Sequence, residues 1–162
     1  MSLNSDFKDL LKSLADFQVK YLVVGGYAVM FYTEPRYTKD LDIWIEASEE
    51  NSKRIFAALS EFGAPLTGMS ADDFAHEGFF YQLGLPPIRI DILMSIPGVS
   101  FADAWPRRIG ASYGEQRISL ISKADLITSK KASGRHIDLH DVEQLTRDLE
   151  SGDPPPSSPG GV

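Results

Sequence analysis

Residues 21–45, YLVVGGYAVMFYTEPRYTKDLDIWI, decide the fold of this chain. The stretch begins with the apolar run Tyr21–Val24, whose length and composition predict a buried strand. A pair of glycines ends this run, and the apolar residues 27–32 that follow predict one or two turns of helix. After a polar loop, residues 40–45 predict a second strand. The segment is therefore organised as strand, glycine pair, short helix and strand.

Two aspartates lie in the second predicted strand. Side chains alternate along a strand, so Asp40 and Asp42 share one face, with Cα atoms roughly 6–7 Å apart. Leu41 and Ile43 then point to the other face, toward a core. Two neighbouring carboxylates repel each other unless a cation lies between them, and oxygen ligands of this kind suit Mg²⁺ or Mn²⁺. The alternative is a pair of aspartates on an exposed strand that binds nothing.

The two glycines add a second kind of site. Gly25 and Gly26 follow a strand and precede a helix, where backbone N–H groups are open to an approaching anion. A phosphate site and a metal site are thus predicted on adjacent elements. This combination is typical of phosphoryl transfer.

A third aspartate lies in a later predicted strand, residues 88–93. Asp91 shares a strand face with Arg89 and is surrounded by apolar residues, and a carboxylate in such a place needs a partner. Either Asp91 forms a simple ion pair with Arg89 or another base, or it belongs with Asp40 and Asp42 in one site.

The remaining elements follow from apolar periodicity and capping residues. Helices are expected at 5–17 (capped by Ser5), 49–61 (capped by Ser48 and ended by Gly63), 100–105 and 122–134. A further helix is expected to follow and to end at about Leu149, and residues 70–73 are expected to form a helical turn. Strands are expected at 79–83, 88–93 and 117–121, and the last of these is expected to be an edge strand. Residues 1–150 are expected to form one domain, and residues 151–162, rich in Pro, Gly and Ser, a disordered tail.

Composition narrows the function. The chain of 162 residues has a net charge of −7, which argues against a broad nucleic-acid-binding surface but leaves room for a small cationic pocket. It has no cysteine, which excludes disulfides and fits a cytoplasmic protein. No apolar run approaches the length of a membrane span and no signal peptide is visible, so no membrane partner is expected.

The glycine pair and the acidic pair together resemble the nucleotidyltransferase fold of the DNA polymerase β superfamily. The matching pattern is Val24-Gly25-Gly26, thirteen residues, then Asp40-Leu41-Asp42-Ile43. The run from Arg36 to Ile43 looks most like small bacterial nucleotidyltransferases related to the AbiEii-type toxins. This resemblance implies an α/β fold, a small mixed sheet with flanking helices, with the metal site exposed at one edge.

The resemblance also implies roles for residues elsewhere in the chain. Ile90-Asp91-Ile92 matches the third acidic position of the superfamily. Residues 124–142, ADLITSKKASGRHIDLHDV, resemble the C-terminal part of the same small proteins. The matching positions there are Lys130, Arg135, Asp138 and Asp141. Relatives often have a lysine where this chain has Ile137, so any role of that lysine is absent.

The implied activity is transfer of a nucleoside monophosphate from an NTP to an acceptor hydroxyl, with release of pyrophosphate. The metal ligands and catalytic residues would be Asp40, Asp42 and Asp91, and the nucleotide-binding residues Gly25, Gly26, Arg36 and Lys130. Mg²⁺ or Mn²⁺ would be the cofactor, and RNA, a protein or a small molecule the acceptor. Three alternatives remain: a non-catalytic module of a toxin–antitoxin pair, a glycosyltransferase that uses a D-x-D motif, and a metal phosphohydrolase.

Overall fold

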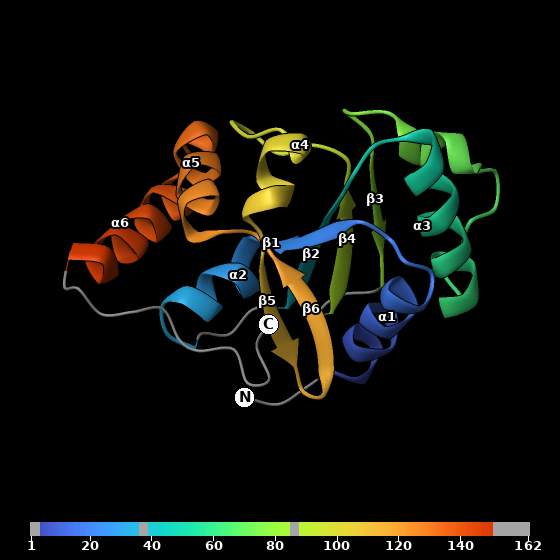
Figure 1. Cartoon of the computed structure of the whole chain (residues 1–162), viewed down its shortest axis with the longest axis horizontal. Coiled ribbons are helices and arrows are strands. Elements are labelled where there is room, and N and C mark those ends of the chain that lie inside the picture. Colours follow the sequence, from blue (N-terminus) through green and yellow to red (C-terminus); the bar gives the residue numbers. More distant parts are fainter. Residues whose placement is uncertain (1–3, 36–38, 85–87, 151–162) are drawn as a thin grey trace.

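The computed structural model describes residues 4–35, 39–84 and 88–150, and it confirms the expected fold class: a mixed sheet with helices on both faces (Figure 1). The helices are α1 (Ser5–Asp16), α2 (Gly25–Tyr32), α3 (Glu49–Phe62), α4 (Phe101–Ala104), α5 (Lys123–Ser133) and α6 (His136–Glu150), with 3₁₀ turns η1 (Ala71–Ala75) and η2 (Trp105–Arg107). The strands are β1 (Tyr21–Val24), β2 (Asp40–Ile45), β3 (Phe80–Leu83), β4 (Arg89–Leu93), β5 (Ile109–Tyr113) and β6 (Gln116–Leu120).

The strands form one sheet in the order β3-β4-β2-β1-β6-β5. β2 is antiparallel to β1 and parallel to β4, so it lies between the first strand of the decisive segment and the strand that carries the third aspartate. β6 is parallel to β1 at its other side. The central strand β2 thereby brings distant parts of the sequence into direct register.

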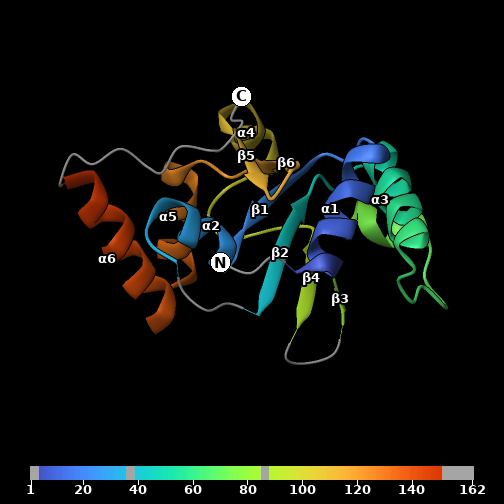
Figure 2. The ribbon, with the colours of Figure 1, turned by 90° about the horizontal axis from the view of Figure 1, so that it is seen from below.

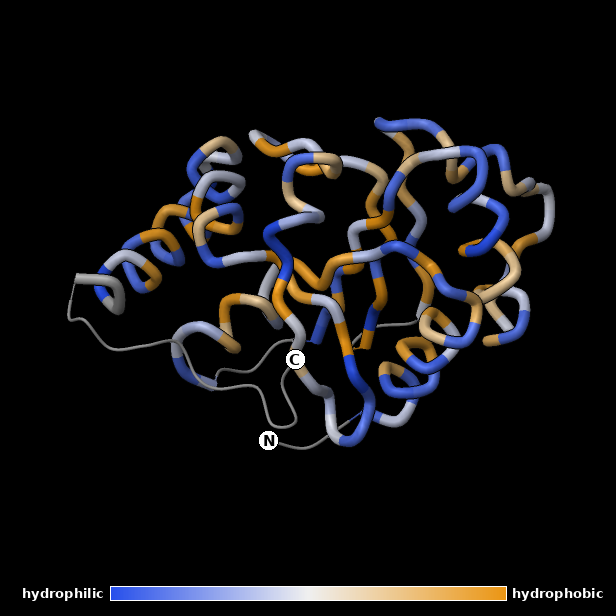
Figure 3. The backbone as a smooth tube through the Cα atoms, viewed as in Figure 1, coloured by the Kyte–Doolittle hydropathy of each residue, from blue (hydrophilic) through white to orange (hydrophobic). Residues whose placement is uncertain are grey.

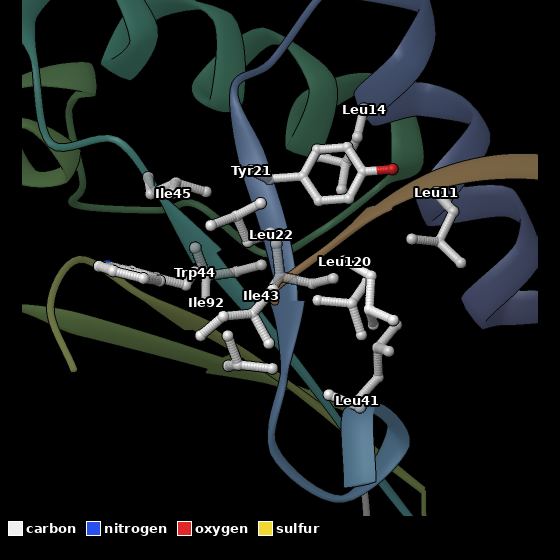
Figure 4. Close-up of a cluster of buried hydrophobic side chains, with 14 of the residues drawn as sticks. Leu11, Leu14, Tyr21, Leu22, Leu41, Ile43, Trp44, Ile45, Ile92 and Leu120 are labelled. Atoms are coloured by element: carbon white, nitrogen blue, oxygen red, sulfur yellow. The ribbon is translucent and has the colours of Figure 1, made fainter. Parts of the chain in front are cut away.

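The two faces of the sheet have different coverings, as Figure 2 shows: α1 and α3 lie on one side, and α5 and α6 on the other. The face toward α1 holds the main core, in which Leu41, Ile43 and Ile45 of β2 lie near Leu11 and Leu14 of α1 (Figure 4). All five are at most 1% exposed. The hydropathy colouring in Figure 3 shows the same concentration of apolar residues along the central strands. The alternation predicted for residues 40–45 is thus confirmed.

Most helix boundaries follow the predicted caps. The Ser48 side chain accepts from the Asn51 N–H at the start of α3, and Gly63 ends this helix with φ +95°. The Ser122 side chain caps α5 in the same way. At the N-terminus the expected cap is wrong by one residue: Asn4, not Ser5, accepts from two backbone N–H groups of α1.

Two expectations about the last strands are wrong. Residues 109–113 were not expected to form a strand, yet they pair with β6 through the two-residue connection 114–115, which begins with Gly114 at φ +61°. β6 therefore lies between β1 and β5 and is not an edge strand. None of the described helices is long and apolar enough to cross a membrane.

Candidate active site

The three predicted acidic residues lie on neighbouring strands of one sheet face. Parallel pairing of β2 and β4 places Asp42 opposite Asp91 and Asp40 opposite Arg89. Residues in register on neighbouring strands point to the same side of the sheet, and the strands lie about 4.7–4.9 Å apart. The structure therefore brings together Asp40, Asp42 and Asp91. Because β2 and β4 are inner strands, the expectation that this site lies at an edge of the sheet is wrong.

Arg89 lies between two of these carboxylates. Its Nη2 atom is 3.4 Å from Oδ2 of Asp40, and its Nε atom is 3.2 Å from Oδ1 of Asp91. The second contact is not an aligned hydrogen bond, since both atoms are buried without a hydrogen-bond partner. The ion pair between Asp91 and Arg89, which the sequence offered as an alternative, is thus present, together with a contact from Arg89 to Asp40.

Asp42 is the carboxylate with the strongest electrostatic perturbation. Burial, followed by the charge of Asp91, a hydrogen bond with Asp91 and the charge of Asp40, raises the pKa of Asp42 to about 7, although Lys130 acts in the opposite direction. Burial and the neighbouring carboxylate of Asp91 thus disfavour the charged form of Asp42. A divalent cation at this place would favour it.

Gly25 fits closely against Asp42. It has φ +67°, and a Cβ atom there would lie 2.0 Å from Oδ2 of Asp42. Gly25 is also the first residue of α2, two residues earlier than predicted, and the N-cap Val24 provides no side-chain acceptor for the first turn. The carboxylate of Asp42 thus lies next to the backbone N–H groups of the first turn of α2, which includes Gly26.

A cavity of about 240 Å³ connects this place to α5 and α6. Gly25 and Asp42 line one side, and Lys130, Arg135 and Asp138 line the other. The helix α5 presents residues spaced by three and four to the cavity, in agreement with helical geometry. These residues are Leu126, Ser129, Lys130 and Ser133. The two serines were not identified in the sequence, although this spacing was visible there.

The predicted cation Lys130 is held by acidic residues. Its Nζ atom is 2.9 Å from Oδ1 of Asp138 and 3.1 Å from Oδ2 of Asp141, and both aspartates are at most 1% exposed. Ser133 and Arg135 donate to Asp138 at 2.5 and 2.6 Å. Burial alone would raise the pKa of Asp138, but hydrogen bonds from Arg135, Ser133 and Lys130 outweigh it and hold the pKa well below the usual range. Arg36, the other predicted cation, lies outside the described residues.

The donor set fits a divalent cation in part. Asp42 and Asp91 are adjacent carboxylates whose mutual repulsion a hard cation would relieve. Asp40 is beside them, but its carboxylate contacts Arg89. Within the described ranges, no group of three or more His, Cys, Asp or Glu side chains is already arranged as a metal site. A cation held by all three aspartates would thus require Asp40 to turn away from Arg89.

The fold is that of nucleotidyltransferase structures. Similar solved structures include the lincosamide antibiotic adenylyltransferase LnuA, bound to lincomycin, with a TM-score of 0.56 and 16% identity over 88% of this chain and 96% of that chain. The antibiotic-resistance factor ANT(2'')-Ia has a TM-score of 0.59 and 11% identity over 91% of this chain and 84% of that chain. A nucleotidyltransferase-like protein (TM1012) from Thermotoga maritima has a TM-score of 0.50 and 18% identity over 90% of this chain and 91% of that chain.

The family is shown by residues 1–148, which match the model described as "Nucleotidyltransferase of unknown function (DUF6036)". The chain belongs to this family. The comparison with curated proteins gives no match. At these identities the solved structures support the fold alone. The class of enzyme that the family indicates is a transferase.

Proposed function

We propose that this protein transfers a nucleoside monophosphate from an NTP to an acceptor hydroxyl. The observation that carries the proposal is the register of Asp42 with Asp91, an under-neutralised carboxylate pair next to the first turn of α2. A helix start with uncapped N–H groups attracts phosphate, and the carboxylate pair attracts the cation that accompanies a triphosphate. The cavity between Gly25 and Lys130 provides room for part of the nucleotide.

The reaction assigns a task to each group. The acceptor oxygen forms a bond to the α-phosphorus, the bond from that phosphorus to the bridging oxygen breaks, and pyrophosphate leaves. Bound Mg²⁺ or Mn²⁺ would neutralise charge on the triphosphate and on the attacked phosphorus. Asp42 and Asp91 would hold the cation, joined by Asp40 once it turns away from Arg89. Asp91 would also accept the proton of the hydroxyl. Gly25 and Gly26 would donate backbone N–H groups to phosphate, with Arg36 as a cationic support.

The role of Lys130 in this proposal is limited by its ion pairs. Its ammonium group lines the cavity, but Asp138 and Asp141 already neutralise it. Three hydrogen-bond donors are available on an ammonium group, so Lys130 can contact a phosphate oxygen while it keeps both aspartates. Its contribution is then smaller than that of an unpaired lysine.

A second candidate is a non-catalytic interaction module, as in a toxin–antitoxin pair. The observation that favours it is Arg89, which already bridges Asp40 and Asp91 where a cation would otherwise be needed. If Arg89 is the permanent counter-ion of this site, the protein needs no metal.

The deciding experiment incubates the protein with each labelled NTP, Mg²⁺ or Mn²⁺ and cell extract, followed by mass analysis of the labelled products. RNA, protein and small molecules are analysed separately, because adenylyltransferases for lincosamide antibiotics share this fold. The proposal predicts a metal-dependent product that gains one nucleoside monophosphate. The interaction module predicts no labelled product and no metal-dependent binding of a non-hydrolysable NTP in calorimetry.

A further inference from the structure

A second and larger groove lies at the end of β1 opposite Gly25. It has a volume of about 630 Å³ and is lined by the end of α1, the start of β1, η2 and parts of β5 and β6. Four cationic side chains lie along it, and we call it the basic groove: Lys20, Arg54, Arg108 and Arg117. Among the residues that the structure describes, no Asp or Glu lines it. This is a local concentration of positive charge in a chain whose net charge is −7.

The four cations are not equally free. Arg54 is paired with Glu50 at 2.6 Å, and Lys20 is 3.8 Å from Glu46. Arg108 and Arg117 are exposed and, within the described part of the chain, neither lies within ion-pair distance of a carboxylate. These two arginines are therefore the groups from which an anion would gain the most.

Arg108 is held in a fixed orientation. Its guanidinium carbon lies 3.8 Å from the centroid of the Trp105 ring, and its Nη1 atom donates to the backbone oxygen of Trp105 at 2.9 Å. The Trp105 ring is in turn stacked on Phe101, with centroids 5.6 Å apart and an interplanar angle of 21°. A guanidinium plane supported in this way resembles the surfaces on which unpaired bases stack.

We propose that the basic groove binds single-stranded nucleic acid. Arg108 and Arg117 contact phosphates, Lys20 and Arg54 add positive charge, and one base stacks on the Arg108–Trp105 pair. A peptide made of Asp and Glu alone could use the charges but has no ring to stack on the arginine, whereas every nucleotide carries both a phosphate and a base. A duplex keeps its bases inside and cannot use that surface. The acidic remainder of the protein confines binding to a short footprint. This inference concerns binding only and does not depend on the transfer reaction.

The test measures the binding of a fluorescein-labelled 12-nucleotide single-stranded RNA by anisotropy between 50 and 200 mM salt. The double variant Arg108→Ala/Arg117→Ala should lose at least about tenfold in affinity, since each phosphate contact is charge-assisted. For single strands the slope of log K against log salt falls by about 0.7 per lost contact, so the variant's slope should be shallower by about 1.4.

The matched control is Lys53→Ala/Arg147→Ala, which removes the same charge from exposed cations paired with Glu49 and Glu143. It should bind RNA within about twofold of the wild type. Trp105 gives a second readout: of the two tryptophans, Trp44 is 1% exposed, so quenching by RNA reports on the groove. The proposal is overturned if the wild type does not bind RNA at 50 mM salt or if both double variants lose affinity equally. Competition by polyglutamate or duplex RNA as effective as that by the single strand also overturns it.

Discussion

Two acidic groups face each other across the same 240 Å³ cavity, and they differ in their counter-charges. Asp138 receives hydrogen bonds from Lys130, Ser133 and Arg135, so its pKa is held below the usual range despite burial. Asp42 faces Asp91, and its pKa is raised to about 7. We call the first group, Lys130, Ser133, Arg135, Asp138 and Asp141, the α5–α6 cluster. The carboxylate site is Asp40, Asp42 and Asp91.

The difference concerns how far the buried carboxylates of each group are neutralised by neighbouring cations and hydrogen-bond donors. The α5–α6 cluster has the cations and donors that buried carboxylates require, and it connects two helices. In the described part of the carboxylate site, Arg89 contacts Asp40 and Asp91, and Asp42 lies beside Asp91. Charge left uncompensated inside a fold is a cost to stability, and it persists where it serves the binding of a ligand. The comparison predicts that damage to the α5–α6 cluster reduces stability, whereas damage to the carboxylate site reduces binding.

The largest expected effect is that of Lys130→Met. Without its ammonium group, Asp138 and Asp141 lose the cation they share, and Asp138 keeps its contacts with Arg135 and Ser133. Removing one partner of a buried ion pair typically costs about 3–5 kcal/mol, and urea denaturation at pH 7 should show a loss of that size. Lys131→Met, at the neighbouring exposed position, should change the free energy of unfolding by less than about 0.5 kcal/mol. A stable Lys130→Met protein with weakened NTP binding would instead make Lys130 a ligand for the triphosphate.

Gly25→Ala tests the contact between the helix start and the carboxylate site. The new Cβ atom would lie 2.0 Å from Oδ2 of Asp42 at a φ of +67°, so Asp42 must move and the backbone is strained. A loss of about 2–3 kcal/mol is expected, together with loss of metal-dependent NTP binding in calorimetry.

The control for this substitution is Gly68→Ala. Gly68 has φ +79°, with nothing within 4 Å of a Cβ atom there, so it carries the backbone strain without the clash. It should destabilise by about 1 kcal/mol and leave NTP binding intact. Equal behaviour of the two variants would show that Gly25 is needed for its φ angle only.

Asp42→Asn should act in the opposite direction on stability. A carboxyl whose pKa is raised in the folded protein destabilises it progressively as pH rises from its ordinary pKa of 3.8 to about 7, and fully above that. The variant should therefore gain about 1–3 kcal/mol over the wild type at pH 8 and little at pH 4, measured by urea denaturation.

Asp138→Asn should show the opposite dependence of stability on pH. The pKa of Asp138 is depressed, so its contribution to stability is present above about pH 4 and is lost as pH falls below that value. This variant should be less stable than the wild type at pH 8, and the difference should shrink toward pH 2. If both variants changed stability in the same direction at pH 8, the contrast between the two groups would not hold.

The sequence predicts the central part of the fold because its periodicity is unambiguous. Alternation at residues 40–45 placed Asp40 and Asp42 on one face and the core on the other, and glycines ended the elements on either side. β5 was missed because Gly110, Ala111 and Ser112 have no strand preference of their own. They form a strand because β6 pairs with them, and that information lies outside the local sequence.

The sequence predicts which residues belong to the site, but it does not predict which of them contact one another. Asp91 was singled out as a charge in an apolar strand, but its register with Asp42 depends on parallel pairing of β4 with β2. Lys130 was chosen for its position in a family pattern, and its contact with Asp141 depends on how α5 packs against α6. Long-range packing of this kind leaves no signal in the spacing of a single sequence. The roles of all these residues in catalysis stay predictions.

The smallest expected effect on stability, and the most informative for function, is that of Asp91→Asn. Asp91 contacts Arg89, whose side chain is 40% exposed and keeps a second contact with Asp40. Asp91 is buried, but Arg89 is partly exposed and keeps Asp40, so no cation is left buried and unpaired and the loss should be about 1 kcal/mol. Relief of repulsion with Asp42 offsets part of it, so the melting temperature should stay within a few degrees of the wild type. Metal-dependent NTP binding should be weakened but not lost, because Asp40 and Asp42 remain, while transfer to the acceptor collapses because the hydroxyl loses its proton acceptor. Arg89→Ala is the companion variant: it breaks the same ion pair from the other side but leaves all three carboxylates, so it should tighten Mn²⁺ binding in calorimetry. Weaker Mn²⁺ binding in Arg89→Ala, or a large loss of stability in Asp91→Asn, would make this pair a structural element and remove Asp91 from the proposed chemistry.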